Sequence, residues 1–188
     1  AEALFRAVAA QYERITGSGN VQNLSNIVWA CATLGYKSEE LLKAVAAQHE
    51  RIAKEGNLQA LSNIVWACAT LGYKSEELLK AVASQHKRIS KEGNLQALSN
   101  IVWSCSTLGY KSEELLEAVL AQHGRIAKSD KVQGMSNICW AFATAGHEAK
   151  NLFKAVAAQR ERIARDGNEQ NVTNTLWSFA IAGYLDEG

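Results

Sequence analysis

An internal repeat of 37 residues is the feature that most constrains how this 188-residue chain can fold. Five tryptophans recur at this spacing, each inside a copy of the same segment: Trp29, Trp66, Trp103, Trp140 and Trp177. Residues 20–56 and 57–93 are almost identical. Such a period is typical of repeat arrays, in which one unit cannot bury its own apolar face and neighbouring units must cover it. We therefore interpret residues 1–188 as a single array.

Each unit predicts two helices. In the second copy an i, i+3, i+4, i+7 apolar stripe runs from Leu61 to Cys68, and Gly72 ends that helix. Ser75 and the acids after it predict the start of a second helix that closes near Lys91. We name these helix A and helix B. Helix A is expected to start near residues 20, 57, 94, 131 and 168, and helix B near residues 1, 38, 75, 112 and 149.

The predicted fold class is all-α, namely an α-solenoid of five 37-residue two-helix repeats with a right-handed superhelical twist. The absence of proline and the abundance of Ala, Leu, Glu and Lys favour helices throughout. Because the connections between helices are short, neighbouring helices are expected to run antiparallel. Neither end of the chain has the character of a polar capping helix, so we expect an excerpt from a longer array or a chain that continues into another domain.

Charge and motif content exclude several functions. The balance of 20 basic and 19 acidic residues gives no global attraction to nucleic acid, so such binding would need local segregation of charge. No apolar run approaches the length of a membrane span. The metal, phosphate and nucleophile motifs of common enzymes are absent from the sequence, and we expect no catalysis, no cofactor and no metal.

The polar side of helix A is an uncharged stripe of amides. A helical wheel places Gln22 and Asn26 opposite the apolar stripe, with Asn23 at one edge. The equivalent residues of the later copies are Gln59, Ala60, Asn63, Gln96, Ala97, Asn100, Gln133, Gly134, Asn137, Gln170, Asn171 and Asn174. Amides carry both a donor and an acceptor and can therefore contact the edges of RNA bases on a concave surface. An alternative is that Asn26 and its equivalents bridge backbone groups between repeats.

One arginine recurs near the end of each helix B, in the series Arg14, Arg51, Arg88, Arg125 and Arg162. A basic residue follows three positions later in four copies, at Lys54, Lys91, Lys128 and Arg165. A row of guanidinium groups beside an amide stripe can hold a phosphate backbone while the amides meet the bases. The alternative is purely structural, because cations in a last helical turn complement the helix dipole.

Other recurring side chains are best interpreted as packing. The tryptophans lie between the apolar and polar sides, so they are expected to pack between repeats, although stacking on a base is conceivable. Cys31, Cys68 and Cys105 fall on the buried stripe and are expected to be small core residues without disulfides.

One position of helix A differs between copies and is occupied by Asn23, Ala60, Ala97, Gly134 and Asn171. A repeat protein that discriminates between RNA sequences requires such variation.

The helix A segment fits the pattern N-x-Q-x-[LMV]-[ST]-N-x-x-W-[AS]-x-[AS]-x-x-G in residues 20–35, 57–72, 94–109 and 168–183, and residues 131–146 lack only its first Asn. This pattern resembles the octotricopeptide repeat and equally the heptatricopeptide repeat, whose unit length is closer. The resemblance covers essentially the whole chain. It implies an array from a chloroplast or mitochondrion that binds single-stranded RNA selectively, at about one nucleotide per repeat and thus about five in all. The alternative is a solenoid scaffold for a protein or peptide.

Overall fold

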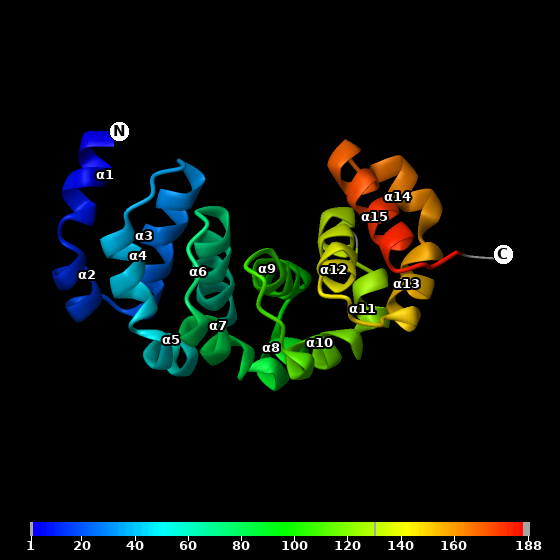
Figure 1. The fold of residues 1–188 in the computed structure, drawn as a ribbon, viewed down its shortest axis with the longest axis horizontal. Coiled ribbons are helices and arrows are strands. Elements are labelled where there is room, and N and C mark those ends of the chain that lie inside the picture. Colours follow the sequence, from blue (N-terminus) through cyan, green and yellow to red (C-terminus); the bar gives the residue numbers. More distant parts are fainter. Residues whose placement is uncertain (1, 130, 186–188) are drawn as a thin grey trace.

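The computed structural model describes residues 2–129 and 131–185, and all of its regular elements are helices. The prediction of an all-α solenoid is confirmed. Figure 1 shows the helices arranged along an open arc, with the amino-terminal and carboxyl-terminal repeats at its two ends. Residues 1 and 186–188, the outermost positions of the predicted array, lie outside the described residues.

The helices predicted as helix A form one continuous layer on the inner side of the arc (Figure 1). Each packs along the next one in the chain, because each has an apolar stripe that its neighbour covers. Their bounds are α3 (Val21–Thr33), α6 (Leu58–Thr70), α9 (Leu95–Thr107), α12 (Val132–Thr144) and α15 (Glu169–Ile181).

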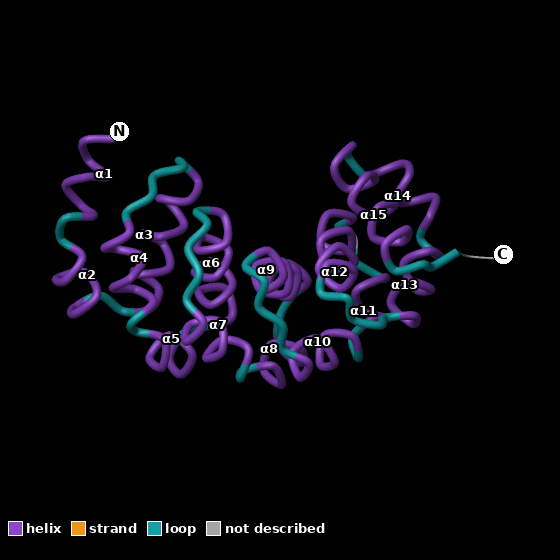
Figure 2. The backbone as a smooth tube through the Cα atoms, viewed as in Figure 1, coloured by secondary structure: helices purple, strands orange, loops and turns teal. Residues whose placement is uncertain are grey.

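The prediction of a single helix B is wrong, because each repeat divides this segment into two short helices. These are α1 (Glu2–Ala9) and α2 (Tyr12–Ser18), α4 (Glu39–Ala46) and α5 (His49–Glu55), α7 (Glu76–Ala83) and α8 (His86–Glu92), α10 (Glu113–Leu120) and α11 (His123–Ala127), and α13 (Lys150–Ala157) and α14 (Arg160–Asp166). Figure 2 shows the interruption as a loop within the outer layer.

Packing between repeats explains this division. The first part, such as α4, packs against α2 of the preceding repeat, whereas the second part, α5, packs against α7 of the following repeat. A straight helix cannot follow both neighbours along a curved array, so the chain bends at Ala47 and Gln48. Each repeat therefore contains three helices: a long inner one and two short outer ones.

The ends of the helices follow from local sequence signals. The side chains of Asn20, Asn57, Asn94 and Asn168 cap the inner helices, each accepting a hydrogen bond of 2.8–2.9 Å from the N–H group three residues later. The glycine after each inner helix has a φ of 59–67°, which only glycine adopts at little cost. The inner helices are therefore held at fixed lengths, and so are the positions of the polar side chains along them.

Candidate nucleic-acid interface

A row of carboxamide side chains lies along the inner helices. We call it the carboxamide row: Gln22, Asn26, Gln59, Asn63, Gln96, Asn100, Gln133, Asn137, Gln170 and Asn174. All ten are exposed or partly exposed. In the first repeat the Gln22 amide donates to Asn26 Oδ1 at 2.9 Å, and Asn57 donates to Gln22 Oε1 at 3.2 Å. From Gln59 onward, the side chains of the row make no hydrogen bond within the described part of the chain, so their donors and acceptors are available to a ligand.

Two hollows follow this row between neighbouring inner helices. The larger, about 420 Å³, lies between α3, α6 and α9 and is lined by Asn26, Trp29, Gln59, Asn63 and Gln96 among others. The second lies between α9 and α12, shares Gln96 with the first, and measures only about 30 Å³. The carboxamide row therefore lines two hollows between Asn26 and Asn137, of which the one nearer the amino-terminal end is much larger.

The sequence-variable position next to the row faces the neighbouring helix. Ala60, Ala97, Gly134 and Asn171 are buried, and only Asn23 is exposed. At Gly134 a Cβ atom would lie 2.5 Å from Leu95 Cδ2, so the absence of a side chain allows α12 to approach α9 closely. The variation at these four positions reflects packing between helices, and their burial leaves no surface for an RNA base.

The recurring arginines contact the protein's own backbone. The Arg51 guanidinium donates to the carbonyls of Thr16 and Gly19, and Arg88 donates to those of Ala53 and Gly56 at 3.3 and 3.0 Å. Arg125 and Arg162 likewise reach the carbonyls of Ser90 and Ala127, at 2.7 and 2.6 Å. Each arginine thus joins its outer helix to the end of the equivalent helix one repeat earlier. These contacts therefore support a structural role at helix ends for the four arginines, and not the predicted role in binding phosphate.

Arg14 is exposed and differs from these four because its guanidinium has no hydrogen-bond partner within the described residues. It lines a hollow of about 400 Å³ together with Asn23 and Asn26. Of the arginines predicted to bind RNA, Arg14 alone therefore has a guanidinium without a partner in the described structure.

Besides Arg14, and Lys131 in the lining of the second hollow, one lysine per repeat remains available in three repeats. Lys54, Lys91 and Lys128 are exposed, and their amino groups have no ion-pair partner among the described residues. We call them the lysine rim. Each lies at the end of an outer helix, shortly before the next inner helix begins. In contrast, Lys37, Lys74 and Lys111 follow the opposite ends of inner helices and pair with Glu39, Glu76 and Glu113 at 3.0, 3.4 and 2.8 Å.

The tryptophans form a row with two different environments. Trp103 and Trp140 have ring centroids 6.4 Å apart, and Trp140 and Trp177 are stacked at 6.3 Å. Trp29 is 45% exposed and has no aromatic ring in contact among the described residues. Packing between repeats, as the sequence predicts, therefore describes the later tryptophans, whereas Trp29 presents its ring to the larger hollow.

The cysteines are small core residues, as predicted. Cys31, Cys68, Cys105 and Cys139 are all buried and unpaired. Burial raises the pKa of the Cys68, Cys105 and Cys139 thiols to about 12, which suppresses the thiolate needed for nucleophilic attack or metal binding.

Over residues 2–129 and 131–185, no group of three metal-ligating side chains comes together. No helix in these ranges is long and apolar enough to cross a membrane.

A polar cluster on the outer side was not predicted from the sequence. His147 is almost buried, with Nδ1 3.0 Å from Glu113 Oε2 and Nε2 3.2 Å from Glu117 Oε1. A signal was present, since Glu117 and His147 replace the Lys and Tyr of earlier copies, such as Lys80 and Tyr110. Simultaneous departure of two positions from the repeat indicates a contact between them.

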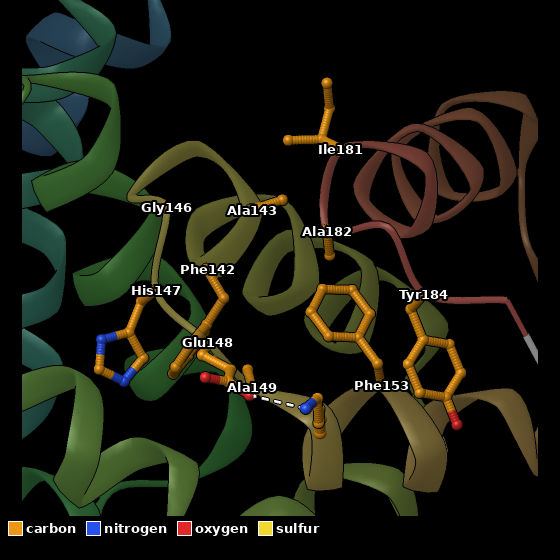
Figure 3. A pocket seen from close by; sticks show the side chains of 11 residues that line it. Phe142, Ala143, Gly146, His147, Glu148, Ala149, Phe153, Ile181, Ala182 and Tyr184 are labelled. Carbon is orange, nitrogen blue, oxygen red and sulfur yellow. Dashed lines mark ion pairs between the residues drawn. The ribbon is translucent and has the colours of Figure 1, made fainter.

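His147 also borders a hollow of about 350 Å³ between α12, α13 and the end of α15. Figure 3 shows the Phe153 and Tyr184 rings on its far side, and Glu148 in an ion pair with Lys150 at 3.0 Å. These side chains are fixed mainly by aromatic contacts, such as the 5.5 Å edge contact of Phe142 with His147. The cluster therefore strengthens the junction between repeats and lies away from the carboxamide row.

Comparison with protein families identifies the chain. Residues 3–187 match the model of the RNA-editing substrate-binding complex 6 protein family, whereas no curated protein matches the sequence. This is an RNA-related family of helical proteins, and the match does not single out the octotricopeptide or heptatricopeptide class that the motif resembles. The match extends over nearly all of the described array, so the chain belongs to the RNA-editing substrate-binding complex 6 protein family.

Proposed function

We propose that the chain binds single-stranded RNA along the carboxamide row. The observation that carries the proposal is the run of side chains from Gln59 to Asn174 that have no hydrogen-bond partner in the described structure, of which those from Gln59 to Asn137 line hollows between the inner helices. Unstacked bases offer donors and acceptors on their edges, which amides can match in either sense. The family name, which refers to an RNA-editing substrate, agrees with an RNA ligand.

The lysine rim supplies the contacts to phosphate in this proposal. Lys54, Lys91 and Lys128 recur once per repeat at the same end of the inner helices, so they follow the path of the groove. Phosphate contacts position a strand, and contacts to base edges select its sequence. We further propose that the chain is not a catalyst, that it acts in a chloroplast or mitochondrion, and that it engages up to about five nucleotides, as the octotricopeptide-like motif implies.

The salt dependence of RNA binding tests this assignment. A labelled pool of random single-stranded RNA is titrated with the protein at several salt concentrations, and fluorescence anisotropy gives the dissociation constant. Each neutralised phosphate of a single strand contributes about −0.7 to the slope of log K against log salt, so three lysines contribute about −2. Changing Lys54, Lys91 and Lys128 together to Gln should remove that part of the slope and weaken binding to all sequences alike.

The chain offers a matched control in Lys37, Lys74 and Lys111. Changing these three to Gln removes the same charge from the same three repeats at the opposite ends of the inner helices. Binding by this control should stay close to that of the unchanged protein. Equal losses of RNA affinity in the two variants would show that only net charge matters and would refute binding along the carboxamide row. Absence of RNA binding by the unchanged protein at low salt would refute the whole proposal.

A second candidate function is a protein-binding scaffold within an assembly. Its support is the family name, which refers to a complex, and the exposure of large apolar side chains on α15, where Leu176 and Ile181 are 67% and 56% exposed; Leu176 holds the position that a following inner helix covers at Val28 and Val65. Exposed apolar groups of this kind mark protein contacts more often than RNA contacts. The scaffold would be favoured if the unchanged protein binds no RNA and if changing Leu176 and Ile181 to Ser abolishes binding of a protein partner.

A further inference from the structure

The larger hollow of the groove has the features of a pocket for one specific ligand. It lies between α3, α6 and α9, and its volume of about 420 Å³ is in the range of small-molecule sites. Its lining contains no charged side chain. No charged side chain of the lining would therefore compensate the charge of a phosphate or a carboxylate, which favours a neutral group as the one that enters.

One wall of the pocket is an aromatic surface. Trp29 is 45% exposed and lines the hollow, and no other aromatic ring of the described chain covers it. The equivalent rings of the last three repeats each contact at least one other ring of this set, at centroid distances of 6.4 and 6.3 Å. An exposed indole surface stabilises a planar ring stacked on it, and such stacking tolerates any base because every base has a π face.

The other walls supply hydrogen-bonding groups. The side chains of Gln59, Asn63 and Gln96 line the hollow and have no hydrogen-bond partner within the described residues. Each carboxamide offers two N–H donors and one carbonyl acceptor. A ligand that matches both the indole and the amides is planar and neutral, with donors and acceptors on its edge.

We infer that this pocket holds one nucleobase of the bound RNA, stacked on Trp29 and contacted on its edge by Gln59, Asn63 and Gln96. This inference rests on the proposed function. It differs from an even distribution of one base per repeat, because the next hollow toward the carboxyl-terminal end measures only about 30 Å³. The array thus anchors a strand by one inserted base near its amino-terminal end, and the remaining repeats contact the strand more superficially.

The test compares Trp29→Ala with Trp177→Ala. The two residues occupy the same position of the repeat and have nearly equal exposure, 45% and 43%, but Trp177 stacks on Trp140 and does not line the hollow. Anisotropy titrations use labelled rA12 and rU12 oligonucleotides at fixed salt. Loss of a base stack should weaken binding by Trp29→Ala at least about fivefold, whereas Trp177→Ala should change it less than about twofold.

Two further measurements separate stacking from misfolding. Trp29→Phe keeps an aromatic surface and should recover most of the affinity lost in Trp29→Ala. The salt slope of Trp29→Ala should equal that of the unchanged protein, because the indole neutralises no phosphate. Gln59→Ala should weaken binding about two- to tenfold through the lost hydrogen bond, whereas Gln11→Ala, an exposed glutamine of the outer layer outside the carboxamide row, serves as its control.

The outcomes distinguish this inference from the proposed function. If the unchanged protein binds RNA and Trp29→Ala binds equally well, the base pocket is refuted and RNA binding along the row stands. If Trp29→Ala and Trp177→Ala lose affinity equally, the pocket is again refuted, because the hollow touches only one of them. If the unchanged protein binds neither oligonucleotide, the pocket and the proposed function fall together.

Discussion

The two halves of the groove have the same carboxamide row but opposite arrangements of tryptophan. Trp103, Trp140 and Trp177 lie against one another, whereas Trp29 is open to a hollow of about 420 Å³. The hollow between α9 and α12 is about 30 Å³. Nearly identical repeats therefore produce different surfaces, because a surface between helices depends on how closely the helices approach and not only on which side chains they carry.

One local difference lies where α12 meets α9. Gly134 occupies the position held by Ala60 and Ala97 in the two preceding repeats, and its missing Cβ makes room for Leu95, which lines the second hollow. The tryptophan rings at the joint between α12 and α15 are as close as those at the joint between α9 and α12, although Asn171 holds the glycine position there, so the ring contacts do not depend on a glycine. The wide half is therefore available to an inserted ligand, and the narrow half is stabilised by contacts among its own rings.

The largest expected effect concerns the arginine contacts that both halves share. Arg88→Met and Arg162→Met should each lower the free energy of unfolding by about 1–3 kcal/mol, because backbone carbonyls lose a charged donor. Urea denaturation followed by circular dichroism measures this change. Similar losses at the two sites would show that the wide and narrow halves are joined in the same way.

The control for this prediction is Arg14→Met, which removes an exposed arginine whose guanidinium has no hydrogen-bond partner in the described structure. It should change stability by less than about 0.5 kcal/mol. The two halves are expected to differ in tryptophan stacking and in the size of the hollow, but not in their arginine contacts. A much larger loss of unfolding free energy for Arg162→Met than for Arg88→Met would contradict this expectation.

A smaller effect is expected from Gly134→Ala, which tests the packing of α12 on α9 directly. The new methyl group would meet Leu95 Cδ2 and Cγ at 2.5 and 2.7 Å, and overpacking should outweigh the gain in helix propensity by about 1 kcal/mol. As α12 moves away, the exciton signal of the stacked tryptophans in circular dichroism should decrease. Ala97→Gly provides the reciprocal change: it should cost about 1 kcal/mol in helix propensity and leave the Trp103–Trp140 signal unchanged.

The smallest effect concerns the polar cluster that joins α10 to the turn after α12. Glu117→Lys or His147→Tyr alone should destabilise the chain, whereas both together restore the Lys and Tyr combination of the earlier repeats. Because Glu117 is exposed, the coupling energy between the two changes should stay below about 1 kcal/mol. Thermal unfolding of the four proteins of this cycle measures it, and strictly additive effects would contradict the contact.

The same cluster gives stability an acid dependence. The hydrogen bond from Lys111, with a smaller contribution from His147, holds the pKa of Glu113 below its usual value. A carboxyl group with a lowered pKa contributes its full stabilisation above the pKa of the unfolded chain, and this contribution is lost as the pH falls through the folded pKa. Glu113→Gln should therefore flatten the acid side of the stability profile. A profile identical to that of the unchanged protein would mean that Glu113 contributes nothing there.

The sequence predicts the inner layer of the fold well because its signals are local. Asn57 and Gly72 define the ends of α6 by contacts within a few residues. The break in the outer helix has no such signal, since Ala47 and Gln48 favour a helix and only packing against two different neighbours bends the chain there. The period of the repeat therefore fixes the architecture, but not the number of helices in each unit.

The candidate site is predictable to a similar extent. A helical wheel places Gln59 and Asn63 on the polar side, where the structure has them. It places Ala97 beside them but gives no information on the helix that covers it. For Arg88 the acceptors lie 32 and 35 residues earlier, so no local pattern could decide between phosphate and backbone. The burial of Ala97 and the backbone acceptors of Arg88 both depend on contacts between repeats, which only the three-dimensional structure shows.

The arginine contacts also have a consequence for how such a chain changes length. Each guanidinium reaches main-chain carbonyls, which every residue possesses, so the joint between units does not depend on a matching side chain in the preceding unit. A duplicated 37-residue segment would bring its own arginine and its own carbonyls, and would join the units on both sides without further substitution. Gene segments of this kind can therefore multiply by simple copying, which agrees with the near identity of residues 20–56 and 57–93.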